Sequence, residues 1–338
     1  MTSAALSLEG SHFFAGKKVL ITGGVGFLGS NLAIRLLELG SDVTLIDTLS
    51  SGSGANLFNI GSLGKDVRVV VGGMGDQKLI APLISRVDVV FNLAGKTSHL
   101  DSMEDPFQDL DSNVVEQLRF LELCRKLNPG LRIIFASTRQ VYGKPEYLPV
   151  DEKHAVNVVD VNGVNKVAAE NYHHVFQAVY GLRPSILRLT NSYGPRMRVK
   201  DARQNFLGIW VKKAIAGEAI EIFGDGTQLR DFNHVADVVD AFLRVAARDE
   251  CIGKTYNLGS EEPLSLRAIA DIFISLESST SVKIVPFPEK LKGIDIGNFY
   301  GDFRLLEQET GWRPRHSMES GLSETLDFYR ENRAQYGI

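Results

Sequence analysis

Short apolar runs rich in β-branched residues alternate with amphipathic segments through the first half of the chain. This alternation is typical of successive strand–helix–strand units, whose strands form a parallel sheet. We therefore expect an α/β fold built on a doubly wound parallel sheet. The predicted strands are residues 17–22, 42–47, 67–71, 87–93, 132–137 and 184–189, and the predicted helices are residues 26–39, 106–127 and 161–180.

The alternation loosens in the second half of the chain. Residues 221–223 and 282–286 are predicted strands between short helices and turns rich in glycine and proline, which indicates a smaller mixed α/β lobe over the carboxyl edge of the sheet. A chain of 338 residues is long enough for both parts. We expect an extension at 1–16, the sheet domain at 17–190 and, at 191–338, mostly a substrate-binding lobe with some segments returning to the sheet domain.

The composition argues against several classes of protein. Apolar residues make up 44% of the chain and charged residues 23%, as in ordinary globular proteins, and no apolar run approaches the roughly 20 residues of a membrane span. The first residues lack a secretory-signal pattern, so we expect a cytoplasmic protein without a membrane partner. A net charge of −4 with dispersed Lys and Arg predicts no nucleic-acid partner. Cys124 and Cys251 lie far apart, so no disulfide or metal site is predicted.

A glycine-rich turn carries the strongest chemical signal. Gly23, Gly26 and Gly29 lie between the first predicted strand and the first predicted helix. Glycines there allow a tight turn and a close approach of the backbone to a pyrophosphate, while the helix amino terminus attracts its charge. Asp47 ends the next predicted strand about 20 residues on, where its carboxylate would bond the adenosine ribose and repel a 2′-phosphate. The spacing predicts a Rossmann-type NAD-binding domain and favours NAD over NADP.

Four further segments extend this pattern: NLAG at 92–95, ASTRQVYG at 136–143, RLTNSYGPR at 188–196 and GDGTQLRDFNHV at 224–235. Together with the G-x-x-G-x-x-G turn, they resemble the extended short-chain dehydrogenases of the nucleotide-sugar epimerase/dehydratase family. The resemblance runs from Lys17 to about Pro314. It implies NAD as the cofactor and a nucleoside-diphosphate sugar, with a UDP-sugar favoured, as the substrate.

The resemblance also implies site residues by position. Arg230 would grip the diphosphate, because a planar guanidinium meets phosphate oxygens bidentately, and no metal is implied. The catalytic positions are Thr138, Asn162 and Lys166, and the substrate-binding positions are Gln140, Asn191, Arg196, Asn205, Arg230 and Asp295. The cofactor-binding positions are Gly23, Gly26, Phe27, Leu28, Gly29, Asp47, Ser51, Gly52, Met74, Leu93, Ala94, Gly95, Asn113 and Lys166.

Residue 162 departs from the family pattern. The family moves the substrate's hydroxyl proton with a Tyr four residues before the Lys, whereas this chain has Asn162 before Lys166. An amide can bond a hydroxyl but cannot take its proton, so a replacement base is needed or the chemistry is lost. Lys166 with a depressed pKa, His99 and His154 are the candidates. The sequence leaves this choice open.

Two smaller departures concern the adenine and the reaction. The family often has Gly-Asp before the residue beside the adenine, whereas this chain has Gly72-Gly73-Met74, so a contact to the adenine amino group is expected to be missing. Gln140 stands where decarboxylating and dehydrating members often have a carboxylate, and an amide cannot act there as a general acid or base. This counts against those reactions, although residues 188–198 resemble the UDP-glucuronate decarboxylases.

Three functions stay open. The leading one is an NAD-dependent epimerase acting at the 4-position of a UDP-hexose through transient oxidation. The alternatives are a UDP-glucuronate decarboxylase or related dehydratase, and a binding protein that keeps both pockets without turnover. The helices predicted at 106–127 and 161–180 resemble the pair that forms the homodimer interface in this family. Leu118, Leu121 and Phe176 are the expected contacts, unless the same apolar stripe faces the sheet.

Overall fold

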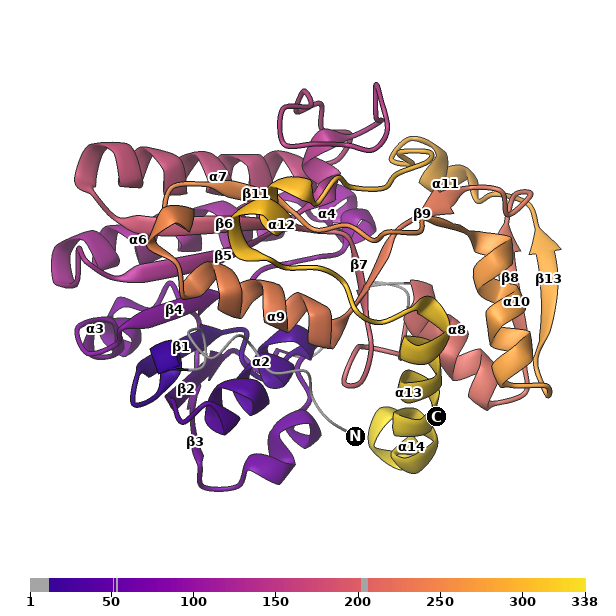
Figure 1. The fold of residues 1–338 in the computed structure, drawn as a ribbon, viewed down its shortest axis with the longest axis horizontal. Helices are drawn as coiled ribbons and strands as arrows, with labels where there is room; N and C mark the ends of the chain where they lie inside the picture. The colour runs from indigo at the N-terminus through magenta and orange to yellow at the C-terminus, as the bar shows by residue number, and fades with distance from the viewer. Residues whose placement is uncertain (1–11, 51, 53, 202–205) are drawn as a thin grey trace.

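The computed structural model describes residues 12–50, 52, 54–201 and 206–338. At its centre, seven strands formed by the described residues make a parallel sheet in the order β11-β6-β5-β4-β1-β2-β3, with helices on both faces (Figure 1). The strands are β1 (Lys18–Thr22), β2 (Asp42–Asp47), β3 (Val67–Val71), β4 (Val89–Asn92), β5 (Arg132–Thr138), β6 (Arg183–Leu189) and β11 (Thr255–Asn257). The predicted α/β fold is confirmed.

The two faces of the sheet carry different helices. Val19 and Ile21 of β1 pack in the apolar layer under α2 (Phe27–Glu38) and α9 (Val235–Ala246), whereas Leu20 packs in the layer under α3 (Gln77–Ile84), α6 (Glu116–Leu127) and α7 (Val161–Tyr180). Side chains alternate between the faces of a strand, so a strand buried on both faces is apolar throughout. This is why the strand runs stand out in the sequence.

The helix predicted at 106–127 is the main correction to the expected elements. The structure divides it into α5 (Pro106–Leu110), a π-helical turn at Asp111–Val115 labelled η2, and α6. A π-turn inserts an extra residue into the helical repeat, which shifts the side chains before it relative to those after it. Apolar periodicity does not reveal such an insertion, because both halves keep an apolar face.

The smaller lobe lies at the right of Figure 1 and contains α8 (Phe206–Ile215), α10 (Leu266–Leu276) and the parallel pair β8 (Ala219–Phe223) and β13 (Ser281–Val285). Two short pairs lie between the lobe and the sheet: β7 (Asn191–Tyr193) with β10 (Phe232–His234), and β9 (Leu229–Arg230) with β12 (Leu264–Ser265). The remaining elements are η1 (Leu57–Leu63), α4 (His99–Glu104), η3 (Arg139–Tyr142), η4 (Asp249–Cys251), α11 (Glu289–Lys292), α12 (Arg304–Thr310), α13 (Met318–Glu331) and α14 (Arg333–Tyr336).

The strand order places the site. The chain moves outward from β1 through β2 to β3 and then returns to β4 on the other side of β1. In doubly wound sheets, ligands bind in the crevice at the carboxyl ends of the strands, where the order reverses. The glycine turn after β1 and the NLAG segment at the end of β4 both lie at this point. Among the described helices, none is long and apolar enough to cross a membrane.

Two residues expected at a dimer interface lie inside the protein instead. Leu121 of α6 is fully buried and Phe176 of α7 is 6% exposed, both in the layer against the sheet, and Leu118 packs on that layer. The apolar faces of α6 and α7 therefore pack against the sheet, which is the alternative that the sequence left open. The outer face of α7 is considered below.

A buried ion pair ties α7 to β6. Arg188 Nε and Nη2 donate to the two carboxylate oxygens of Glu170 at 3.0 and 2.6 Å, and Nη1 donates to the Tyr142 hydroxyl at 2.7 Å. Ser137 Oγ donates to the same carboxylate. This network holds the helix that carries Asn162 against the sheet.

Replacing Glu170 by Ala leaves Arg188 buried without its counter-charge, so we expect the free energy of unfolding to fall by about 3–5 kcal/mol. Urea denaturation followed by circular dichroism measures the change. Glu122→Ala is the control, because Glu122 pairs with Arg125 and Lys126 at the surface, and exposed pairs contribute little. Equal shifts in the two variants would show that the buried pair does not hold α7 in place.

Candidate active site

The glycine-rich turn shapes the amino terminus of α2. Gly23 has a φ of 67°, in the left-handed region that favours glycine. A Cβ on Gly29 would lie 2.4 Å from the carbonyl oxygen of Gly23, so the turn closes only around a glycine. Gly26 is the N-cap of α2 and has no side chain to occupy the space in front of the first helical N–H groups. The turn therefore offers backbone donors to a phosphate.

Asp47 ends β2 beside this turn. Its Oδ2 accepts a hydrogen bond from the Val25 backbone N at 3.1 Å, and its Oδ1 accepts one from the Leu49 backbone N at 3.0 Å. The side chain is buried. These bonds hold a carboxylate next to the glycine turn, the arrangement needed to recognise an adenosine ribose.

The segment after β4 is held by a buried hydroxyl. Thr22 Oγ1 accepts hydrogen bonds from the backbone N–H groups of Leu93 and Ala94, each at 3.0 Å. Leu93 lines a cavity together with Phe27 and Leu28. The predicted cofactor residues of β4 and α2 therefore face one space.

Gly95 allows a close approach to Asn113 and Lys166. A Cβ on Gly95 would lie 2.5 Å from Asn113 Oδ1 and 3.3 Å from Lys166 Nζ. Asn113 Oδ1 is buried and makes no hydrogen bond with any described residue. Lys166 Nζ donates to the Ala136 carbonyl at 3.2 Å and lies 5.0 Å from the centre of the Phe135 ring. Three of the predicted cofactor residues are therefore brought together.

Asn162 is buried at the first turn of α7, with both amide hydrogens engaged. Its Nδ2 donates to Asp109 Oδ2 at 3.0 Å and to the Lys96 carbonyl at 2.9 Å. A carboxylate and a carbonyl both require a donor, so the amide orientation is set by its partners. Only the amide oxygen is left for a ligand, and it can accept a hydrogen bond from a hydroxyl.

Asp109 organises the residues around Asn162. Its Oδ1 accepts hydrogen bonds from Asn113 Nδ2 at 2.9 Å and from Asn165 Nδ2 at 2.8 Å, and the carboxylate is 3% exposed. One buried carboxylate thus orders three amides from η2 and α7. The sequence analysis did not identify it. Its spacing of four residues from Asn113 on a predicted helix was the available signal.

The predicted catalytic residues share a cavity of about 160 Å³ at the carboxyl ends of the central strands. Thr138, Asn162 and Lys166 line it together with Asn191 and His99. Burial lowers the pKa of Lys166 to about 8, against the opposing effect of nearby carboxylates. A lysine in this state is still mostly protonated at neutral pH, but it loses its proton more readily than an exposed lysine. The cavity therefore brings together Thr138 and Asn162, which can hydrogen-bond a hydroxyl, with Lys166, whose pKa is lowered, and the imidazole of His99.

The imidazole of His99 lies against a buried carboxylate. His99 Nδ1 is 3.0 Å from Asp160 Oδ2, an ion-pair distance without hydrogen-bond geometry. The same oxygen accepts a hydrogen bond from Gln140 Nε2 at 2.8 Å. Asp160 Oδ1 caps α7 by accepting from the Gly163 backbone N at 2.6 Å. Burial raises the pKa of Asp160, but the contacts with His99, Gly163 and Gln140 outweigh it and hold the pKa below its usual range. No described residue bonds His99 Nε2, so this nitrogen remains for a ligand.

His154 is a structural residue of its loop. Its Nε2 accepts a hydrogen bond from the Glu146 backbone N at 2.9 Å, and its Nδ1 lies 2.7 Å from the Ala155 carbonyl. The ring packs between Tyr142 and Tyr147 and is 4% exposed. Both ring nitrogens are engaged, which removes His154 from the candidate bases.

A second group of predicted residues gathers around Arg230. Arg230 Nη2 lies 3.4 Å from Asp295 Oδ1, and Nη1 donates to the carbonyls of Leu229 (2.9 Å) and Gly297. Burial and the nearby charge of Arg139 together lower the pKa of Arg230 to about 9, against the opposing effect of Asp295 and Asp231. Arg230 and Asp295, predicted independently as substrate-binding residues, are thus in contact.

Asn191 connects this group to the cavity. Its Nδ2 donates to the Asp231 carbonyl at 3.0 Å, and its Oδ1 accepts from Arg139 Nη2 at 3.2 Å. Arg139 and Asn191 both line the cavity that holds Thr138. The two groups of residues are therefore neighbouring parts of one site.

Arg196 is not brought into this site. Its Nη1 donates to Asn31 Oδ1 at 3.1 Å, its Nε donates to the Asn59 carbonyl at 3.3 Å, and its guanidinium stacks on Phe328. These partners belong to α2, η1 and α13, so the geometry gives its predicted substrate contact no support.

For the remaining predicted cofactor and substrate positions, the structure gives only local observations. Met74 is buried in the apolar layer with Leu20. Gly52 has a φ of 89°. Ser51 and Asn205 lie outside the described residues.

Glu116 supplies a carboxylate that the sequence analysis missed. A Cβ on Gly73 would lie 3.6 Å from Glu116 Oε1. The Glu116 carboxylate therefore lies beside Gly73, the position at which the family often has an Asp. Burial raises the pKa of Glu116. The approach of Glu116 to Gly73 depends on how α6 packs against the segment after β3, so the sequence alone does not reveal it.

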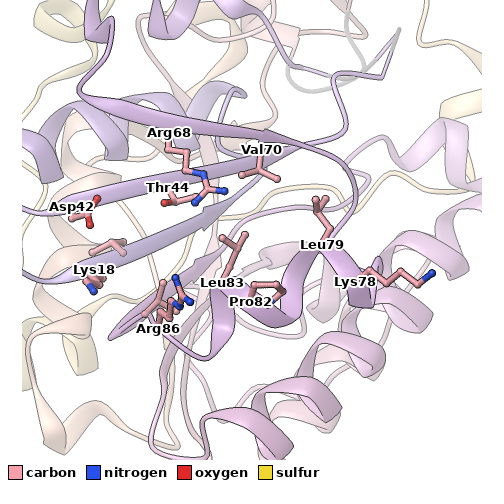
Figure 2. Close-up of a pocket in the computed structure, with 12 residues that line it drawn as sticks. Lys18, Asp42, Thr44, Arg68, Val70, Lys78, Leu79, Pro82, Leu83 and Arg86 are labelled. Atoms are coloured by element: carbon pink, nitrogen blue, oxygen red, sulfur yellow. The ribbon is translucent and has the colours of Figure 1, made fainter.

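A larger cavity, of about 450 Å³, lies away from this chemistry. Figure 2 shows Lys18, Asp42 and Arg68 around it, together with Pro82 and Arg86 of the α3 region. These strand residues lie at or near the amino ends of β1, β2 and β3, whereas the glycine turn follows the carboxyl end of β1. Its position separates this cavity from the predicted nucleotide site.

One set of potential metal ligands comes together among the described residues. His234, His316 and Glu324 offer ligand atoms within 4.8 Å of one another. Asp237 Oδ1 lies 3.0 Å from His316 Nδ1, and the two imidazole rings pack with centres 4.3 Å apart. These contacts join the start of α9 to the segment just before α13, and the expectation of no metal stays a prediction.

The fold and the site define a Rossmann-type dinucleotide-binding enzyme with a polar cavity at the switch point of its sheet. The sequence model of the NAD dependent epimerase/dehydratase family matches residues 19–259, and the chain belongs to this family. Its members are NAD-dependent enzymes, and the glycine turn, Asp47 and Lys166 fit that cofactor.

Three similar proteins show the range of the family. The chain is 31% identical to a UDP-glucose 4-epimerase of Mycolicibacterium smegmatis, covering 94% of this chain and 100% of the relative. It is 32% identical to a UDP-N-acetyl-alpha-D-glucosaminuronate decarboxylase of Bacillus cytotoxicus, covering 93% and 98%. A crystal structure of a UDP-glucuronic acid 4-epimerase from Bacillus cereus, in complex with UDP-glucuronic acid and NAD, matches with a TM-score of 0.83 and 26% identity, covering 93% and 99%.

The carboxylate of Asp47 should make the protein bind NAD more tightly than NADP, because it would lie against the 2′-phosphate of NADP. We expect a difference of about tenfold or more in dissociation constant, measured by calorimetry. Asp47→Asn should narrow this difference, since the amide keeps the size of the side chain and removes its charge. Equal affinities of the wild type for the two cofactors would contradict this assignment.

Proposed function

We propose that the protein is an NAD-dependent nucleotide-sugar epimerase that acts at the 4-position of a UDP-hexose by transient oxidation. The observation that carries the proposal is the shared cavity of Thr138, Lys166 and His99, which lies between the glycine turn and the Arg230 group. A hydride acceptor, a proton acceptor and a diphosphate anchor would then surround one sugar ring.

Each residue has a defined part in this reaction. Bound NAD would supply a reversible hydride acceptor for C4 of the sugar. The Thr138 hydroxyl and the Asn162 amide oxygen would hydrogen-bond the C4 hydroxyl and orient it. Lys166 would bond the nicotinamide ribose, and its charge would favour release of the hydroxyl proton. Arg230 would hold the diphosphate while the sugar presents its opposite face to the returning hydride.

The proton acceptor in this proposal is His99. The Asp160 carboxylate lies 3.0 Å from His99 Nδ1 as an ion-pair contact without hydrogen-bond geometry. Its charge would stabilise the protonated imidazole, and Nε2 would be the basic atom. Gln140 supports the arrangement by donating to the Asp160 carboxylate. Lys166 is the less suitable base, because its Nζ already donates to the Ala136 carbonyl and lies over the Phe135 ring.

The environment of Gln140 supports epimerisation over decarboxylation and dehydration. Those alternatives need an acid or base to exchange a proton with a sugar carbon, and the Gln140 amide is committed to Asp160. A UDP-glucuronate decarboxylase remains the second candidate, because a relative with a comparable identity carries out decarboxylation.

Incubation with NAD and a panel of UDP-, dTDP-, GDP- and CDP-sugars tests the proposal. Product analysis by NMR and absorbance at 340 nm would show the C4 epimer with little NADH accumulation. A pentose product would establish decarboxylation, and a 4-keto-6-deoxy product dehydration. Binding of NAD and a sugar nucleotide without any product would establish the third possibility, a binding protein.

His99→Ala should reduce kcat by about 10²–10⁴-fold, the range for a lost general base, while NAD affinity stays nearly unchanged. Asp160→Asn should reduce kcat less and change its pH profile, because Asn can still cap α7 but no longer stabilises a protonated imidazole. His12→Ala, at an exposed residue outside the site, is the control. Full activity of His99→Ala would remove the imidazole from the mechanism.

We also propose a homodimer that uses the outer face of α7. Val164, Val175 and Val179 are 51%, 51% and 65% exposed, and their spacing places them on one side of the helix. Phe107 of α5 is 76% exposed, and α5 packs against α7. A second copy of the helix pair would cover these apolar side chains.

Val175→Lys combined with Val179→Lys should convert the dimer to a monomer, because two charges would be buried at its centre. Sedimentation equilibrium at micromolar concentration measures the mass. Val156→Lys, at an exposed valine in the loop before α7, is the control and should leave the mass unchanged. A wild-type monomer at this concentration would refute the dimer.

A further inference from the structure

Two histidines and a glutamate face one another outside the nucleotide site. His234 ends β10 and is the N-cap of α9, His316 lies just before α13, and Glu324 lies on α13. The two imidazole rings have centres 4.3 Å apart and planes inclined by 35°. His234 Nε2 is 4.0 Å from Glu324 Oε2. The structure thus brings three side chains with metal-binding atoms together from two distant parts of the chain.

The Nε2 atom of His234 lacks a partner inside the protein. The residue is 1% exposed, and no described residue hydrogen-bonds this nitrogen. The distance of 4.0 Å to Glu324 is too long for a hydrogen bond. A Cβ on Gly194 would lie 3.0 Å from Nε2, so the glycine leaves this atom uncovered by a side chain. A buried polar atom in this state is unfavourable unless a ligand engages it.

Asp237 orients the imidazole of His316. His316 Nδ1 donates to Asp237 Oδ1 at 3.0 Å, and Asp237 Oδ2 accepts from the backbone N–H groups of Arg315 and His316, each at 3.0 Å. A carboxylate at Nδ1 keeps the ring proton on that atom, so the lone pair of Nε2 is available. Histidines that bind metals usually have a carboxylate or carbonyl partner of this kind on the other ring nitrogen.

The close packing of α13 presents Glu324 to the two imidazoles. A Cβ on Gly321 would overlap the Tyr193 hydroxyl, so the glycine lets α13 approach β7. Gly321 and Glu324 are three residues apart and lie on one side of the helix. The Tyr193 ring packs edge-on against His234, with centres 5.4 Å apart. Glu324 is itself exposed, so its carboxylate can reach the imidazoles from the solvent side.

We propose that His234, His316 and Glu324 bind a zinc ion through the Nε2 atoms of the imidazoles and the carboxylate. Imidazole and carboxylate ligands suit Zn²⁺, whereas Mg²⁺ and Ca²⁺ are bound through oxygen. Three protein ligands leave the fourth tetrahedral position to water. The ion joins the start of α9 to α13. This assignment departs from the expectation of no metal, which rested on the lack of a ligand spacing in the sequence.

Two small rearrangements accompany coordination. Zinc ligands lie about 2.0–2.2 Å from the ion, so the exposed side chain of Glu324 turns inward. His234 Nδ1 accepts a hydrogen bond from the Ala236 backbone N at 3.4 Å, which is longer than usual. Coordination through Nε2 moves the ring proton to Nδ1 and removes this bond. The ring gives up one long hydrogen bond and gains a metal–nitrogen bond at its buried, unpartnered atom.

Calorimetric titration of the full chain with ZnCl₂ and MgCl₂ tests the assignment, after removal of bound metals with a chelator and of the chelator by gel filtration. We expect one Zn²⁺ per chain, with a dissociation constant in the micromolar range or below, and no measurable Mg²⁺ binding. His316→Ala and Glu324→Ala should each weaken Zn²⁺ binding by about 100-fold or more, since each removes a ligand. Glu319→Ala, at an exposed residue of the same helix, is the control and should leave the affinity unchanged.

Asp237→Asn tests the orientation of His316 without removing a ligand. The amide nitrogen would replace Oδ1 and donate to His316 Nδ1, which moves the ring proton to Nε2 and blocks coordination. We expect the Zn²⁺ affinity to fall by about 10–100-fold. Titration with Co²⁺ provides a spectroscopic measurement, because Co²⁺ in a tetrahedral site absorbs visible light strongly. The wild type and Glu319→Ala should show this absorption, and His316→Ala should not.

Several results would overturn the zinc site. A wild type that binds no Zn²⁺, or that binds Mg²⁺ as tightly as Zn²⁺, would exclude it. An affinity that His316→Ala and Glu324→Ala leave unchanged would place the ion at other residues. A loss in His316→Ala alone would show that the proposed set of three ligands is wrong. A loss in both ligand variants and in Asp237→Asn, with the control unchanged, is the result that supports the site.

Discussion

The buried carboxylate of Asp109 is the constraint on which the site depends. An ionised carboxylate inside a protein is stable only when hydrogen bonds replace its hydration, and Asp109 obtains them from the amides of Asn113, Asn162 and Asn165. A tyrosine at position 162 could donate one hydrogen bond at most, whereas the amide donates both to Asp109 and to the Lys96 carbonyl. The amide at 162 is therefore part of the support for α5 and η2, and it cannot also be the proton acceptor.

A second constraint is the charge of the cavity. Lys166, Arg139 and Arg230 are largely withdrawn from water, and burial lowers the pKa of all three. Burial also raises the pKa of Asp231 to about 7, so this carboxyl supplies only part of a negative charge near neutrality. The site thus holds three buried cations, and the carboxyl groups of Asp231 and Asp295 lie close to two of them. Anionic ligands that compensate them stabilise the folded protein by binding only to it.

The sequence predicts the parts of this protein that depend on local pattern. Six of the seven strands of the sheet and the helix at 161–180 were located within about two residues, whereas the three-residue edge strand β11 was not predicted. Strands buried on both faces and a helix with a clear N-cap and a C-terminal glycine have strong local signals. The helix at 106–127 was predicted as continuous because η2 arises from contacts with α7, which are distant in sequence. The sequence left open whether Leu121 and Phe176 face a dimer interface or the sheet, because an amphipathic pattern shows that a face is buried and not what buries it.

The candidate site likewise combines features that the sequence predicts with features that depend on contacts between distant parts of the chain. The structure brings Thr138 and Lys166 into one cavity and Arg230 into contact with Asp295, and their roles stay a prediction from the family resemblance. His99 and His154 could not be separated from the sequence, since both lie next to predicted loops. Their surroundings distinguish them, because a loop engages both ring nitrogens of His154, whereas His99 lies beside the Asp160 carboxylate.

In the proposed mechanism, His99, which lies against the first turn of α7, takes the part of the Tyr that Asn162 replaces. Asp160 caps α7 and contacts His99, while Lys166 lies further along that helix. The imidazole and the lysine are therefore both positioned by α7, through its cap and through its side-chain face. Because the Arg188–Glu170 pair fixes α7 against β6, the distance between the two groups is held by rigid elements, as acid–base chemistry requires. The proposed proton acceptor has moved in the sequence, from the helix to the start of α4, while remaining at the amino end of α7 in space.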